Sequence, residues 1–108
     1  MSTSPKVVNI GKSFSRFPAG RYLADGPASG QRFREEVLVP LLAAGHSILV
    51  QLDDALGYGS SFLEEAFGGL VRQGHDAEEI LKKITFESFD DSLIEEIQTY
   101  IREAESNG

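Results

Sequence analysis

A mostly apolar run followed by a glycine-rich stretch constrains this fold more than any other feature. Residues 48–70 read ILVQLDDALGYGSSFLEEAFGGL, and four of the six residues at 48–53 are apolar. Such a run predicts a strand that is covered on both faces, and Asp53 and Asp54 mark where the chain returns to the surface. We therefore expect residues 48–52 to form the central strand of a sheet.

The loop after this strand predicts the functional surface. Gly57 and Gly59 favour a tight turn, and a helix begins at Ser60 and Ser61. Either serine can cap this helix by accepting a hydrogen bond from an early backbone N–H, which also offers a partial positive charge. In an open α/β sheet, the loop beyond the carboxyl end of a strand is where ligands and partners are usually bound.

The rest of the chain alternates between strand and helix patterns. Residues 6–10 predict a strand, and an apolar stripe from Phe33 predicts a helix with a kink or an early end at Pro40. The helix after Ser61 should stop at Gly74, and the two glycines inside it indicate that something packs closely against them.

A short helix at residues 76–82, a strand at 83–86 and a final helix capped within residues 90–92 follow. The pattern predicts an α/β sandwich with a mixed, largely parallel central sheet and about three or four helices. Four residues are expected in its core: Phe62, Phe67, Ile97 and Ile101.

Length and composition predict one small domain. The 108 residues suit a single unit at 6–102, with a disordered leader at 1–5 and a disordered tail at 103–108. The absence of cysteine excludes disulfides and thiolate metal sites. We expect no cofactor, no metal and no membrane segment, and a cytoplasmic protein.

The net charge of −7 is unevenly distributed. Residues 1–34 carry six basic side chains against one acidic, whereas the remainder carries four against sixteen. Most of the surface would therefore repel phosphate, which argues against general nucleic-acid binding. The basic third leaves a local anion site open, for which Arg21, Arg32 and Arg34 are the candidates. The alternative is that these arginines pair with acids, namely Asp25, Glu35 and Glu36.

Three segments carry a family resemblance that spans roughly residues 7–101, namely FPAGRY at residues 17–22, DGPASGQRFRE at 25–35 and GYGSSFLEEAFGGL at 57–70. They resemble a bacterial family of STAS-like domains of unknown function. This resemblance implies a STAS-type α/β architecture, in agreement with the pattern of elements.

A strand ending in Leu-Asp and a helix opening with Ser-Ser are also distantly similar to the anti-sigma-factor antagonists. That similarity implies a protein partner, either an ATPase of the histidine-kinase type or a sensor module. It also implies phosphorylation of a serine, with Ser60 favoured and Ser61 second. The antagonists open this helix with Asp-Ser-Ser-Gly, whereas here Gly59 replaces the aspartate and Phe62 the glycine.

These features favour a non-catalytic regulatory domain that binds a protein through residues 53–65. The chain has no Gly-x-Ser-x-Gly elbow and no base placed beside a serine, so we do not expect an enzyme. The alternative is a nucleotide or small-anion sensor that uses the same glycine-rich loop and the nearby arginines. The residues expected to contact a protein partner are Asp53, Asp54, Tyr58, Gly59, Glu64 and Glu65.

Overall fold

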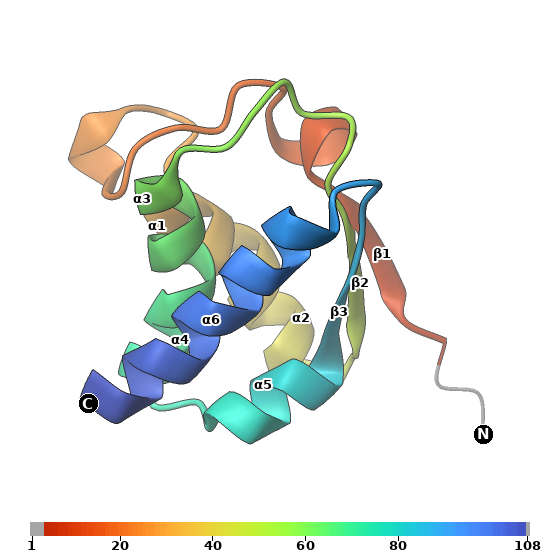
Figure 1. The fold of residues 1–108 in the computed structure, drawn as a ribbon, viewed down its shortest axis with the longest axis vertical. Coiled ribbons are helices and arrows are strands. Elements are labelled where there is room, and N and C mark those ends of the chain that lie inside the picture. Colours follow the sequence, from red (N-terminus) through yellow and green to blue (C-terminus); the bar gives the residue numbers. More distant parts are fainter. Residues whose placement is uncertain (1–3, 108) are drawn as a thin grey trace.

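The sheet has three parallel strands, with the predicted central strand in the middle (Figure 1). A computed structural model describes residues 4–107, and the side chains up to residue 104. β1 (Lys6–Asn9) and β3 (Ile84–Glu87) flank β2 (Ile48–Gln51), and Ile48 pairs with Lys6 on one side and Ile84 on the other. The predicted α/β fold is confirmed, although the sheet is wholly parallel rather than mixed.

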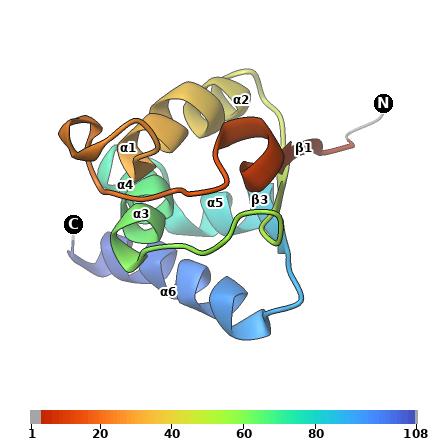
Figure 2. The same ribbon diagram turned by 90° about the horizontal axis from the view of Figure 1, so that it is seen from above.

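Helices α1 to α6 cover only one face of this sheet (Figures 1 and 2). The strands follow one another in the order β1-β2-β3, so two crossovers of the same hand place their helices on the same side. Burial alternates accordingly: Val50 is buried, whereas Leu49 is only partly covered and Val7 beside it is 58% exposed. The expectation of a strand covered on both faces was therefore wrong.

The first crossover ends in one continuous helical stretch. This stretch comprises α1 (Gly30–Phe33), the π-helical turn η3 (Arg34–Leu38) and α2 (Val39–Ala43). It is preceded by the π-helical turn η1 (Ile10–Phe14) and the 3-10 turn η2 (Leu23–Asp25). The helix does not end at Pro40. A π-helical turn precedes the proline, in which the Val39 N–H reaches back to the Arg34 carbonyl, and the stretch stops before Gly45, whose φ is +88°.

The second crossover contains the helix that follows the glycine-rich loop. It comprises α3 (Ser60–Leu63), η4 (Glu64–Gly68) and α4 (Gly69–Arg72), and it stops before Gly74, whose φ is +113°. The close packing expected at its two glycines is present. A Cβ on Gly69 would collide with the Arg34 guanidinium, and one on Gly68 would lie 3.3 Å from the Tyr100 carbonyl oxygen.

The chain then forms α5 (Ala77–Lys83) and, after β3, the long helix α6 (Asp91–Asn107). Asp90 caps α6 by accepting hydrogen bonds from the N–H groups of Ser92 and Leu93, as expected. α6 continues past residue 103, the predicted start of the tail, and the Ala104 side chain is buried. Residues 1–3 of the expected leader and Gly108 of the tail lie outside the described residues.

Aromatic rings fill the core between the helices and the sheet. Phe33 lies 5.9 Å from Phe62 and 6.1 Å from Phe67 between ring centroids, and Phe67 lies 5.3 Å from Phe86 of β3. The four predicted core residues, Phe62, Phe67, Ile97 and Ile101, are all fully buried. This core holds the helix after the glycine-rich loop firmly against the sheet.

Candidate functional site

The glycine-rich loop lies at the carboxyl edge of the sheet, beside the connection that leaves β1 (Figures 1 and 2). The Leu56 N–H donates to the Arg16 carbonyl over 2.8 Å and joins the two segments. A Cβ on Gly11 would collide with the backbone of Asp54 and Ala55, so the two segments touch closely at this point as well. The two loops therefore form one surface.

Gly57 and Gly59 are not explained by the fold. Neither has a positive φ, and a Cβ on either would meet nothing within 4 Å. Side chains would therefore fit at both positions without strain, so the backbone here does not depend on these glycines. Their effect is to leave bare backbone open to an approaching molecule.

Asp53 and Asp54 are exposed and connect the ends of the strands. Asp53 accepts hydrogen bonds from the Ser88 hydroxyl over 2.7 Å and from the Phe89 N–H over 2.8 Å. Asp54 accepts from the Asn9 side-chain amide over 2.6 Å. Both carboxylates hold loops in place and still face solvent.

Tyr58 is half-buried rather than an exposed anchor. Its hydroxyl donates to the Leu52 carbonyl oxygen over 2.6 Å, and its ring lies 6.1 Å from the ring of Phe62. Burial, together with the negative charges of Asp53 and Asp54, raises the pKa of the Tyr58 hydroxyl above its ordinary value. Tyr58 therefore anchors the loop to the core.

The two serines are exposed, and neither caps the helix. Gly59 occupies the N-cap position, and no side chain accepts a hydrogen bond there, because Ser60 is already the first helical residue. The Ser60 side chain lies near the hydroxyl of Tyr100 on α6 and opposes the rise in the pKa of that hydroxyl. Donation of that hydroxyl to Glu96, with some burial, raises the pKa of Tyr100 to about 12.

Glu64 and Glu65 are held by three arginines, and we call these five residues the Glu64–Glu65 cluster. Arg34 and Glu65 form a buried ion pair at 2.6 Å, with 4% and 8% of their side chains exposed. Arg21 and Arg72 each lie 2.5 Å from Glu64 and reach Glu65 at 3.2 and 3.0 Å. Burial alone would raise the pKa of Glu64, but Arg72 and Arg21 outweigh it and lower that pKa.

The structure therefore does not gather the three predicted arginines around an open site. Arg34 is buried in the cluster, and Arg21 contributes to it from the partly exposed side. Arg32 points elsewhere and pairs with Glu36 at 3.1 Å, as the alternative prediction proposed. Glu64 and Glu65, expected at a partner surface, have their carboxylates occupied within the protein.

Three exposed apolar side chains at this edge were missed in the sequence analysis. Phe17 is 69% exposed, Leu56 is 65% exposed and Phe89 is 99% exposed, and they lie on the connections after β1, β2 and β3 respectively. The available signal was the isolation of each residue among glycine, proline and polar neighbours, outside any helical or strand pattern.

A shallow depression of about 520 Å³ on the open side of the sheet is lined in part by Phe89, Asp53 and Asp54. Its lining includes the amides of Asn9 and Gln51, which hydrogen-bond to each other over 3.2 Å, and the carboxylate of Glu87. No group of three or more histidines, cysteines or acids suited to a metal ion occurs within residues 4–107. No helix in this part of the chain has the length and apolar character of a membrane span.

Comparison with known proteins gives one match. A family model described as a STAS-like domain of unknown function matches residues 29–93, which include β2, the glycine-rich loop, the helix after it and β3. No curated protein and no solved structure matches the chain significantly.

Proposed function

The chain belongs to the family of STAS-like domains of unknown function, and on this premise we propose that it is a non-catalytic regulatory domain that binds another protein. The proposed surface is the set of loops at the carboxyl edge of the sheet, which we call the loop face. It consists of Phe17, Leu56, Phe89 and the exposed carboxylates of Asp53 and Asp54.

One observation carries this proposal: the connection after each of the three strands exposes at least one large apolar side chain. An isolated exposed Leu needs no explanation, but three such residues on adjoining loops, two of them aromatic, form the kind of centre found in protein interfaces. The open space beside Gly57 and Gly59 lets a partner approach the backbone between them.

The partner's chemistry follows from this surface. Asp53 and Asp54 border the apolar side chains and remain exposed, so a partner with basic residues around an apolar centre is complementary. The similarity to anti-sigma-factor antagonists favours an ATPase of the histidine-kinase type or a sensor module as this partner.

Replacing the apolar side chains should abolish partner binding without unfolding the domain. We expect the triple variant Phe17→Ser/Leu56→Ser/Phe89→Ser to weaken the complex by at least about 100-fold, because central interface residues commonly contribute about 2 kcal/mol or more each. Affinity chromatography from the native host identifies the partner, and calorimetry then measures the affinity of each variant.

Val7→Ser is the matched control, because Val7 is 58% exposed but lies on the open face of the sheet. It should bind like the original protein. Equal affinity of the triple variant and the control would exclude the loop face as the binding surface.

Ser60 is the favoured site of regulation on this surface, with Ser61 second. Ser60 is exposed and lies at the first helical position, where backbone N–H groups tolerate a phosphate. Ser60 lies near Tyr100, whose hydroxyl donates to Glu96, so a phosphate on Ser60 would be repelled by that carboxylate. A phosphate beside the apolar side chains of the loop face would also have to lose its hydration when the partner packs there, and this cost opposes binding.

Substitution of Ser60 should separate binding from stability. Since Ser60 is not the cap, we expect Ser60→Ala and Ser60→Asp each to change the free energy of unfolding by no more than about 0.5 kcal/mol. Ser60→Asp should weaken the partner complex at least about tenfold, and Ser60→Ala should preserve it. Calorimetry on both variants decides the matter, and indistinguishable affinities would remove Ser60 from the switch.

A further inference from the structure

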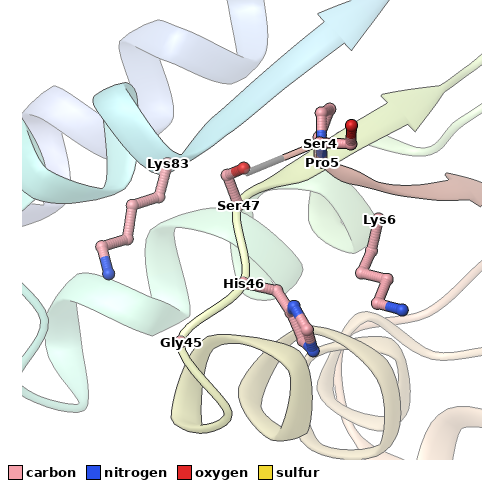
Figure 3. Close-up of a pocket in the computed structure, with 7 residues that line it drawn as sticks. All are labelled: Ser4, Pro5, Lys6, Gly45, His46, Ser47 and Lys83. Carbon is pink, nitrogen blue, oxygen red and sulfur yellow. The ribbon is translucent and has the colours of Figure 1, made fainter. Parts of the chain in front are cut away.

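A second depression lies at the opposite, amino-terminal edge of the sheet, where the chain enters the strands (Figure 3). It has a volume of about 510 Å³, within the range of small-molecule sites. Lys6 begins β1, Gly45, His46 and Ser47 precede β2, and Lys83 ends α5 just before β3. All three strand entries therefore contribute to one site.

The backbone holds these residues in place. The Lys6 N–H donates to the Ser47 carbonyl over 2.9 Å, which ties the start of β1 to the turn before β2. That turn is fixed by Gly45, whose φ is +88°, and by a hydrogen bond of 3.1 Å from the His46 N–H to the Leu41 carbonyl. The position of His46 beside the two lysines is set by this turn.

The charge of the depression is opposite to that of the protein. The chain has a net charge of −7, yet the lining contains two lysines, one histidine and no acidic residue. Among the residues whose side chains the structure describes, no carboxylate forms an ion pair with Lys6 or Lys83. The depression at the carboxyl edge is the reverse, with Asp53, Asp54 and Glu87 against Lys12.

The cations are spread rather than convergent. In Figure 3 the side chain of Lys83 extends on one side of His46 and that of Lys6 on the other. A single small anion cannot contact both ammonium groups as closely as a longer anion with several charges. The arrangement therefore suits a ligand whose negative groups are spaced along a short molecule.

We propose that this amino-edge site binds a small molecule with two or more phosphate or carboxylate groups. Lys6 and Lys83 contact its two ends, and His46 and the Ser47 hydroxyl contact its middle. The alternative anion site at the glycine-rich loop would use Arg21, Arg32 and Arg34, but those guanidinium groups pair with Glu64, Glu36 and Glu65 respectively. The site needs no protein partner, so its test is independent of the loop face.

Titration with inorganic tripolyphosphate and, separately, with citrate tests the proposal. At constant ionic strength we expect saturable binding of at least one probe, with chemical-shift changes at the backbone amides of Gly45, His46 and Ser47. Acetate, which carries one charge, should bind at least about fivefold more weakly, since it reaches only one lysine. Comparison of the two probes distinguishes phosphate from carboxylate recognition.

Neutralising either lysine should weaken binding of the tighter-binding probe by about fivefold. This is the effect of removing one unit charge about 4 Å from a charge on the probe in water. Lys6→Gln and Lys83→Gln are therefore the test variants, and their combination should cost about 25-fold. Lys12→Gln changes the net charge equally at the other end of β1 and should have no such effect. An equal loss in Lys12→Gln, or no saturation of either probe below about 10 mM, would overturn the proposal.

Discussion

Glu65→Leu should lower the free energy of unfolding by about 3 to 5 kcal/mol, as expected when one partner of a buried ion pair is removed. The Arg34 side chain would remain 4% exposed and charged, with the Glu35 carboxylate 3.5 Å away as its nearest remaining acid. Arg21 and Arg72 would still form ion pairs with Glu64, so the loss of stability comes mainly from the Arg34 guanidinium. Urea unfolding measures it, against a total stability of about 5 to 15 kcal/mol for such domains.

Two further variants identify the cause of this loss. Arg34→Met in the Glu65→Leu background should recover most of it, because no uncompensated charge is then buried. Arg32 is two residues from Arg34 in sequence and forms an exposed ion pair with Glu36. Arg32→Met removes this pair and should cost no more than about 0.5 kcal/mol of stability. A loss below about 1 kcal/mol in Glu65→Leu, or no recovery in the double variant, would show that the pair is hydrated rather than buried.

The elements of the fold could be predicted because their signals are local. The apolar run before Asp53 becomes β2, and the helical stripe containing Phe62 and Phe67 becomes a buried face. The N-cap of α6 at Asp90 and the stop at Gly74 also depend on neighbouring residues only. Which faces of the sheet the helices cover could not be predicted in this way. That depends on the order of the strands, which the pattern of elements does not specify.

The roles of the acidic residues could not be predicted for the same reason. Glu64 and Glu65 follow two serines near a helix start, where acids usually face solvent. Their partners Arg21 and Arg34 are 43 and 31 residues away in sequence, and only the packing of the two crossovers brings them together. One local trace of this packing is Gly69, whose missing side chain makes room for the Arg34 guanidinium.

The two edges of the sheet therefore differ in a way that follows from the topology. In a wholly parallel sheet, all strand entries lie at one edge and all exits at the other. Here the entries contribute Lys6 and Lys83, and the exits contribute exposed apolar side chains with Asp53 and Asp54. The proposed anion site and the proposed protein-binding face would therefore lie at opposite edges of the sheet and would not compete for space.

Phe67→Ala should cost about 3 to 5 kcal/mol, the usual loss for removing a buried phenylalanine. Phe67 is fully buried and lies edge-on to both Phe33 and Phe86, at 6.1 and 5.3 Å between centroids. It therefore links the first crossover, the second crossover and β3, and each aromatic pair adds about 0.5 to 1.5 kcal/mol beyond area burial. Urea unfolding monitored by circular dichroism measures the loss.

Phe89→Ala is the matched control, because it removes the same atoms from a side chain that is 99% exposed. It should change the free energy of unfolding by less than about 0.5 kcal/mol, since those atoms are hydrated in the folded protein. A loss below about 1 kcal/mol in Phe67→Ala would mean that the aromatic core does not hold the helix after the glycine-rich loop. The same two variants also separate loss of a direct partner contact from loss of stability. Phe89→Ala should weaken the complex in a protein of unchanged stability. Phe67→Ala can weaken it only by loosening the helix that carries Ser60.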